Sequence, residues 1–172
     1  LTGRELKQPT IQYETSGSSV NELVEIEITN PELNPRFVVG LIRNVEIKPS
    51  PYQVQRRLRL AGQRPINSIV DATNYAMIEL GEPLHAFDYD VLKERAGDKK
   101  IKIITRAAKD GEKLTTLDGA ERTLTAMNVL VCDEKGSLSL AGVMGGSESE
   151  VTDQTKNVLL EGAAWNFINI RR

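Results

Sequence analysis

Apolar residues in the first third of the chain are spaced as in two strands. Residues 20–30, VNELVEIEITN, alternate apolar and charged positions, which predicts a half-exposed strand ending at Asn30. Residues 36–47, RFVVGLIRNVEI, form a more continuous apolar run and predict a more buried strand. The polar residues up to about Ser19 predict a lead-in with little regular structure.

A helix is predicted after these strands. It begins at Ser50-Pro51, because serine can cap a helix and proline fits its first turn, and it ends at Gly62. Arg56 and Arg59 are expected to point outward, since the apolar residues share another face of the helix. These apolar residues are Val54, Leu58 and Ala61.

A second helix is predicted from about Asn67 to Leu80, where Gly81 ends it. Beyond residue 90 the pattern changes to short β-rich runs separated by turn pairs such as Asp-Gly and Lys-Gly. These runs are KIKIITRAA, EKLTTLD, NVLVCD, SLSLAGVM and NVLLEGAAW. The sequence therefore predicts an α+β fold, a compact layered domain with helices early and a mostly antiparallel sheet in its second half.

The composition is that of an ordinary soluble domain. A length of 172 residues suits one domain, or two small closely packed ones, and the formal net charge is -2. No apolar run approaches the roughly 20 residues that a membrane-spanning helix needs. The N-terminus also lacks a targeting pattern. We therefore expect a cytoplasmic protein without a membrane partner.

One segment departs from this even distribution of charge. Residues 36–64 contain several basic residues but only one acid, Glu46. The basic residues are Arg36, Arg43, Lys48, Arg56, Arg57, Arg59 and Arg64. This cluster predicts one basic face, which either contacts a phosphate backbone or is simply the solvated face of an amphipathic helix.

Metal binding and nucleophilic catalysis find little support in the residues present. The only histidine is His85 and the only cysteine is Cys132, so no zinc site of the usual nitrogen and sulfur ligands is expected. Cys132 lies in the apolar run VLVC and is predicted to be a buried small hydrophobic residue. A Ser-His-Asp arrangement would need His85, yet no serine has a G-x-S-x-G context. His85 itself is predicted in a loop, where it is either functional or structural.

Two other features indicate chemistry. AGVMGGSES, residues 141–149, places Gly145 and Gly146 beside acids that would repel phosphate, and no Lys-Ser/Thr follows as in a phosphate loop. Glu161 interrupts the apolar run NVLLEGAAW, so its carboxylate is either turned to solvent or held in a pocket for a purpose.

Three segments carry a specific family resemblance. They are RPINSIVDATNYAMIELGEPLHAFD (64–88), LAGVMGGSESEV (140–151) and TKNVLLEGAAW (155–165). In order and spacing they closely resemble the B3/B4 module of bacterial phenylalanyl-tRNA synthetase β subunits. The resemblance divides the chain into a lead-in with the first strand, residues 1–35, and a B3/B4-like editing domain, residues 36–172. We expect this domain to be truncated at its C-terminal end, before a Thr-x-Ala stretch that the family also uses.

The resemblance implies that the module removes tyrosine wrongly attached to tRNA(Phe) by hydrolysing the ester. It places catalytic roles on His85, Gly145 and Glu161, and substrate-binding roles on Arg64, Pro83, Gly145, Gly146 and Glu161. Bare backbone at Gly145 would let the substrate approach closely. The carboxylate of Glu161 would accept a hydrogen bond from the tyrosine hydroxyl, and a site of this kind rejects the analogue without a hydroxyl by about 10⁴ to 10⁵.

For the reaction itself, we expect an ordered water to attack the ester carbonyl, with backbone amides stabilising the developing negative charge. His85 would orient the water or the terminal ribose, as a positioning group rather than a true general base. Arg64 would meet the terminal nucleotide, because a guanidinium can pair with phosphate or stack on a base.

The resemblance also implies partners and alternatives. The partners are the acceptor end of tRNA(Phe), tyrosine as the misacylated amino acid, and the synthetase α subunit in a parent enzyme of two α and two β subunits. No cofactor or metal is expected in this chain, whereas the parent synthetase uses ATP and magnesium. The alternative is a non-catalytic tRNA-docking or assembly module of the same synthetase. An unrelated carbohydrate- or peptide-binding β domain would require all three matches to be coincidence.

Overall fold

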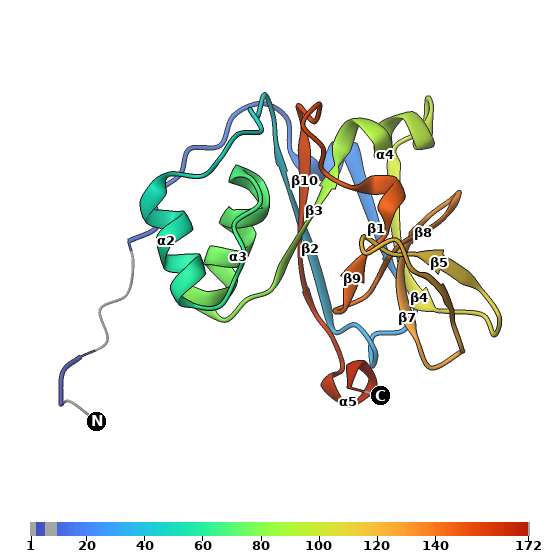
Figure 1. Cartoon of the computed structure of the whole chain (residues 1–172). Helices are drawn as coiled ribbons and strands as arrows, with labels where there is room; N and C mark the ends of the chain where they lie inside the picture. Colours follow the sequence, from blue (N-terminus) through green and yellow to red (C-terminus); the bar gives the residue numbers. More distant parts are fainter. Residues whose placement is uncertain (1–2, 6–9, 172) are drawn as a thin grey trace.

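Two sheets packed face to face, with a pair of helices outside the smaller sheet, form the domain (Figure 1). The computed structural model describes residues 3–5 and 10–171. The predicted α+β class is confirmed, although helices also occur in the second half of the chain. These later helices are α4 (Tyr89–Ala96) and α5 (Phe167–Ile170).

The smaller sheet has three antiparallel strands in the order β2-β10-β3. They are β2 (Arg36–Ile42), β10 (Val158–Ala164) and β3 (Leu84–Asp88). The prediction of a more buried strand at 36–47 is wrong, because β2 is an edge strand whose alternate residues face solvent. Val38 and Ile42, for example, are 46% and 45% exposed. Apolar content alone does not distinguish an edge strand from a central one.

The two predicted helices are α2 (Tyr52–Leu60) and α3 (Ser68–Leu80). Asn67 caps α3 by accepting from the amides of Ile69 and Val70, and Gly81 ends it in the left-handed conformation at φ 77°. The predicted serine cap of α2 is wrong. The Ser50 hydroxyl is buried and instead donates to a carboxylate of α3.

The larger sheet has five strands in the order β1-β4-β7-β8-β9. They are β1 (Val24–Ile28), β4 (Ile101–Ala107), β7 (Val129–Asp133), β8 (Gly136–Leu140) and β9 (Met144–Gly145). Only β1 and β4 pair in parallel within it, so the prediction of a mostly antiparallel sheet is confirmed. The strand predicted from residue 20 begins later, because α1 (Val20–Leu23) forms a helical turn capped by Ser19.

The remaining elements cover the larger sheet. A small hairpin pairs β5 (Lys113–Thr115) with β6 (Glu121–Thr123), and a 3-10 turn, η1 (Ser147–Ser149), follows β9. The main core lies between the two sheets and includes Phe37, Phe87, Val131 and Leu159. Cys132 is buried as predicted, and burial raises its thiol pKa to about 11. Among the described residues no helix is long and apolar enough to cross a membrane.

Candidate active site between the two sheets

A row of three residues crosses the inner face of the smaller sheet. Glu161 on β10 pairs with Val39 on β2 and with His85 on β3. Because directly opposite residues of antiparallel strands point to the same face, these three side chains are neighbours on that face. The rows on either side are apolar, since Leu159 and Ala163 pack into the core between the sheets. The sheet register therefore places one carboxyl group in the middle of an apolar surface.

The carboxyl group of Glu161 is buried and incompletely bonded. Its residue is 6% exposed, and its Oε2 is the one buried side-chain polar atom without a hydrogen-bond partner in the described part of the chain. Burial raises its pKa to about 8. At neutral pH this acid is therefore mainly protonated, in contrast to the charged carboxylate expected from the sequence. A protonated carboxyl can both donate and accept a hydrogen bond.

His85 lies beside this carboxyl as a neutral imidazole. It belongs to β3 rather than to a loop, so its predicted loop position is wrong. Burial lowers its pKa to about 4. The ring packs edge-on against Phe87, with 4.5 Å between the ring centroids. A neutral ring at pH 7 retains one donor and one acceptor nitrogen, which suits orientation of a water or a hydroxyl.

Gly145 brings the larger sheet into contact with this row. A methyl group added at Gly145 would lie 2.5 Å from Cε1 of His85 and 3.0 Å from Cδ1 of Leu117. The bare backbone is therefore required, in the first place, for the imidazole to approach β9. His85 thus links the two predicted residues, because it contacts Gly145 and is paired opposite Glu161.

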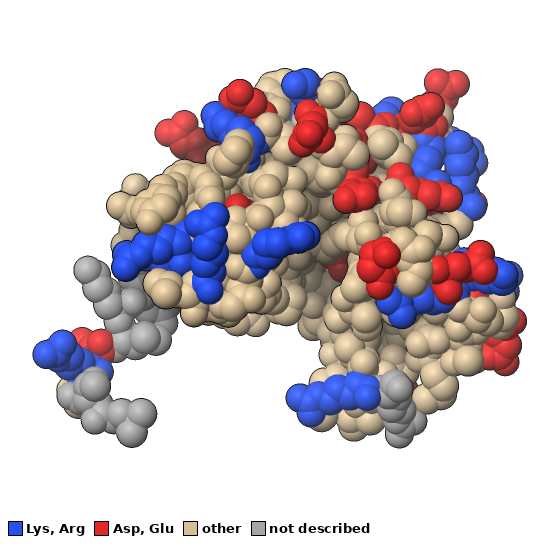
Figure 2. Space-filling view, viewed as in Figure 1, with Lys and Arg blue, Asp and Glu red and all other residues tan. Residues whose placement is uncertain are grey.

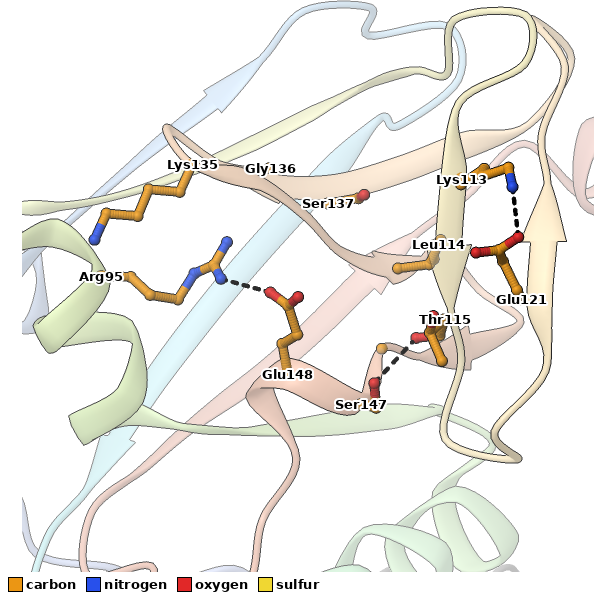
Figure 3. A pocket seen from close by; sticks show the side chains of 11 residues that line it. Arg95, Lys113, Leu114, Thr115, Glu121, Lys135, Gly136, Ser137, Ser147 and Glu148 are labelled. Atoms are coloured by element: carbon orange, nitrogen blue, oxygen red, sulfur yellow. Dashed lines mark hydrogen bonds and ion pairs between the residues drawn. The ribbon is translucent and has the colours of Figure 1, made fainter.

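Gly146 lies against Leu138 rather than against His85. A methyl group there would lie 2.5 Å from the carbonyl oxygen of Leu138, and its own amide donates to that oxygen over 2.8 Å. Gly146 also lines a polar cleft of about 360 Å³, whose lining includes neither Glu161 nor His85. Four charged groups in the cleft pair with one another (Figure 3), Arg95 with Glu148 and Lys113 with Glu121, and Lys135 also lines the cleft.

The other two predicted residues lie at the surface. Pro83 is exposed and directly precedes β3, two residues before His85. Arg64 is exposed in the segment between α2 and α3, and no hydrogen bond or ion pair joins it to Glu161 or His85. The structure therefore brings together Glu161, His85 and Gly145, with Pro83 near by in the chain.

Asp71, for which the sequence pattern predicts no role, holds the segment of Arg64 in place. Asp71 on α3 is 1% exposed and accepts from the Ser50 hydroxyl at 2.6 Å and from the Ile66 amide at 2.7 Å. These bonds fix both ends of the region that contains α2. An acid directly after the apolar pair Ile69-Val70 was the available signal, but only the fold shows where it points.

In the described ranges 3–5 and 10–171, no cluster of three or more His, Cys, Asp or Glu residues is arranged to hold a metal ion. The site is therefore defined by one carboxyl, one imidazole and closely approaching backbone.

The fold and site together define a small two-sheet α+β domain with a buried carboxyl group between its sheets, whose Oε2 has no hydrogen-bond partner among the described residues. A family profile described as "B3/4 domain" matches residues 33–172, so the chain belongs to the B3/4 domain family. This confirms the resemblance noted in the sequence.

Named relatives agree with the family. The chain is 44% identical over 172 residues to a protein of Bacillus cereus (strain ZK / E33L) and 45% identical over 174 residues to one of Carboxydothermus hydrogenoformans. Both are named phenylalanine–tRNA ligase beta subunit. Each match covers 100% of this chain and 21% of the relative, so the chain spans about a fifth of their length.

One solved structure has the same fold. It is the crystal structure of an N-terminal fragment of the phenylalanyl-tRNA synthetase beta subunit from Pyrococcus horikoshii. The TM-score is 0.61 at 17% sequence identity, over 92% of this chain and 47% of that chain. At this identity the comparison supports the arrangement of the two sheets and not the roles of individual residues.

Proposed function

We propose that this domain hydrolyses the ester of tyrosyl-tRNA(Phe) and so removes a wrongly attached tyrosine. The observation that carries the proposal is the unbonded Oε2 of Glu161, in a row that lies between two apolar rows of the sheet. A tyrosine ring entering beside this row gains apolar contacts, and its hydroxyl supplies the missing hydrogen bond. Phenylalanine gains the same apolar contacts but leaves Oε2 without a partner.

This difference gives the selectivity that proofreading needs. A site that hydrogen-bonds a substrate hydroxyl rejects the analogue without it by about 10⁴ to 10⁵, because its buried polar group is then left unpaired. The neutral form of Glu161 lowers the cost of the empty site, since burying a neutral acid costs less than burying a charge. When the substrate binds, Glu161 hydrogen-bonds the phenol hydroxyl. It does not act as the general base for the attacking water.

The neutral His85 orients the attacking water or the terminal ribose, and backbone amides near Gly145 stabilise the oxyanion. Arg64 and Pro83 lie at the surface, where they contact the acceptor end of the tRNA. The tRNA, the synthetase α subunit, ATP and magnesium belong to the proposed parent enzyme, whose relatives are about five times the length of this chain.

The test measures ester hydrolysis by the purified chain with radiolabelled tyrosyl-tRNA(Phe) and phenylalanyl-tRNA(Phe). We expect the tyrosyl ester to be cleared at least about 100-fold faster than the phenylalanyl ester, and Glu161→Ala to reduce its clearance at least about 100-fold, since a polar contact to the substrate hydroxyl is lost. Glu148→Gln is the matched control, because Glu148 is exposed and lies outside the row.

Normal clearance by Glu161→Ala would contradict the role of the carboxyl. A wild-type chain that binds tRNA(Phe) but never exceeds spontaneous hydrolysis would instead support the non-catalytic docking module.

A further inference from the structure

The helical layer of the domain carries arginines without acidic partners. In the described part of the chain, no ion pair involves an arginine of the basic cluster. These arginines are Arg36 and Arg43, at the two ends of β2, and Arg56, Arg57, Arg59 and Arg64 in the helical layer. On and around the larger sheet, by contrast, arginines and lysines pair with nearby acids. Figure 2 shows the result: blue side chains gather over the helical layer with few red ones among them.

Helix α2 presents part of this cluster as an ordered stripe. Leu58 is 0% exposed and fixes the inward face of the helix. Tyr52, Arg56 and Arg59 follow one another at i, i+4 and i+7 on the outward face, and all three are exposed. We call these three residues the α2 stripe. Tyr52 is 72% exposed, a high value for an aromatic residue on a folded helix.

Arg57 has a different surrounding. Its guanidinium hydrogen-bonds the Tyr75 hydroxyl and lies 5.8 Å from the centre of that ring. Arg57 therefore helps to join α2 to α3, and it does not belong to the α2 stripe.

Local helix energetics do not explain the α2 stripe completely. Arginines in the last turn interact favourably with the helix dipole. However, Arg56 and Arg59 are like charges at i and i+3, which is unfavourable, and α2 contains no acid to compensate. The dipole also gives no reason for an exposed tyrosine in line with them. Arg59 donates to Oε1 of Gln55 at 3.0 Å, but this partner is neutral and leaves the charge of Arg59 uncompensated. A polyanion whose bases stack on an aromatic ring complements all three side chains.

We propose that the α2 stripe docks a single-stranded RNA segment outside the hydrolytic site. Arg56 and Arg59 each bind a backbone phosphate, because a guanidinium matches phosphate with two parallel hydrogen bonds. Tyr52 stacks on a base, as aromatic residues do in single-strand binding grooves. The inference rests on the proposed function only for the RNA concerned, the unpaired end of a tRNA.

Local charge on this face, rather than net charge, attracts the RNA. The whole chain has a formal net charge of -2, so it exerts no overall attraction on nucleic acid. The docked strand is thereby restricted to the helical layer. The cations around the larger sheet are already paired with acids, so that surface does not attract the RNA strand.

The experiment measures fluorescence anisotropy of a labelled uncharged tRNA(Phe) and of a labelled single-stranded RNA 12-mer, from low to moderate salt. For Arg56→Gln/Arg59→Gln we expect affinity to fall at least about tenfold at low salt, and the slope of log K against log salt to decrease by about 1.4, as for two lost single-strand phosphate contacts. Tyr52→Ala should weaken binding about tenfold without changing the slope, and Tyr52→Phe should restore it, because the ring and not the hydroxyl stacks.

The matched control is Lys99→Gln/Lys113→Gln, which also removes two exposed cations but takes them from ion pairs around the larger sheet, away from the helical layer. This variant should bind RNA within about twofold of the wild type, since paired surface charges contribute little. Equal losses in both double variants would overturn the proposal, because binding would then follow charge and not position. Stronger arginine-dependent binding of poly-glutamate than of RNA would overturn it in favour of an acidic protein partner.

Failure of this proposal is distinguishable from failure of the proposed function. Glu161→Ala should retain RNA affinity, and Arg56→Gln/Arg59→Gln should still cleave the tyrosyl ester once saturated with substrate. Arginine-dependent binding without any hydrolysis would leave the α2 stripe standing and refute hydrolysis. Hydrolysis of the tyrosyl ester, together with RNA binding that the stripe variants do not change, would support the hydrolytic function and refute the role of the α2 stripe.

Discussion

Acidic residues lie in opposite environments in two regions of the molecule. One region is the row of Glu161, Val39 and His85, and the other is the ion-paired surface beside the larger sheet, which we call the flank. On the flank, Arg95 binds Asp133 through two hydrogen bonds of 2.6 and 2.9 Å, and Arg106 binds Glu112 in the same way. Hydrogen bonding to Arg106 lowers the pKa of Glu112 to about 2, against the effect of its burial. In the row, no cation or donor reaches Glu161 Oε2, and burial raises the pKa of the group to about 8.

The difference separates structural acids from an acid available for binding. An acid that is paired and fully hydrogen-bonded stabilises the fold and has nothing left to offer a ligand. An acid that is buried without a partner reduces stability, and it is retained where a ligand completes its hydrogen bonds. Three measurements of stability test this distinction, and they are independent of any assay of hydrolysis.

The largest effect is expected on the flank. Asp133→Ala removes both bonds to Arg95 and the bonds that Asp133 accepts from the amides of Lys135 and Gly136. We expect the free energy of unfolding in urea to fall by about 3 kcal/mol, because a partly buried guanidinium loses its main partner.

Glu148→Gln provides the comparison for that variant. It also removes an acid from Arg95, but the Glu148 side chain is 72% exposed. It should change the free energy of unfolding by less than about 0.5 kcal/mol. Equal effects of Asp133→Ala and Glu148→Gln would contradict the view that burial and complete bonding make the flank structural.

An effect of similar size and opposite sign is expected in the row. The folded-state pKa of Glu161 is about 8, against 4.5 for an ordinary glutamate, so the folded protein retains a proton that the unfolded chain loses. This group therefore lowers stability progressively as the pH rises from about 4.5 to about 8. Glu161→Gln cannot ionise, and its stability relative to the wild type should increase by a few kcal/mol, about 2 to 4, between pH 5 and pH 8.5.

Urea unfolding of both proteins across this range measures the difference. His85, with its pKa lowered to about 4, adds stability as the pH rises from about 4 to 6.5, but it does so in both proteins and largely cancels. A pH-independent difference between Glu161→Gln and wild type would show that Glu161 is ionised in the folded protein. The proposed recognition of tyrosine by a neutral acid would then be wrong.

The smallest effect is expected where charges are paired but exposed. Lys113 and Glu121 are 2.6 Å apart, yet their side chains are 61% and 59% exposed. Lys113→Gln should change the melting temperature by no more than about 1–2 °C, since an exposed pair contributes less than about 0.5 kcal/mol. A loss comparable to that of Asp133→Ala would show that pairing alone, without burial, accounts for the stability of the flank.

Local patterns in the sequence predicted which helices and strands form around the site. They predicted less well how these elements are buried and placed. The start of α3 near Asn67 and its stop at Gly81 depend on a few neighbouring residues, and both predictions are confirmed. The Asp133 to Gly136 turn and the strand containing Glu161 were recognised for the same reason. By contrast, helix α4 was missed, although Asp88 caps it by accepting from the amides of Asp90 and Val91.

The position of Ser50 shows why other predictions were wrong. As a local signal, serine before proline indicates a helix cap, but burial beside Asp71 gives its hydroxyl a stronger partner. Likewise β2 has the apolar content of a central strand and lies at a sheet edge. The hydrogen-bond partner of Ser50 and the position of β2 in its sheet both depend on residues far away in the chain. A local sequence pattern contains no information about those residues.

The candidate site illustrates the same division. The sequence by itself singled out Glu161, His85 and Gly145 as unusual, because a lone acid in an apolar run, a lone histidine and a paired glycine are visible without coordinates. Only the tertiary structure decided that the three lie together, since antiparallel pairing of β10 with β3 sets His85 opposite Glu161 and packing of β9 brings Gly145 against the imidazole. It also decided their protonation, because the pKa values of Glu161 and His85 depend on how completely the two sheets exclude water from between them.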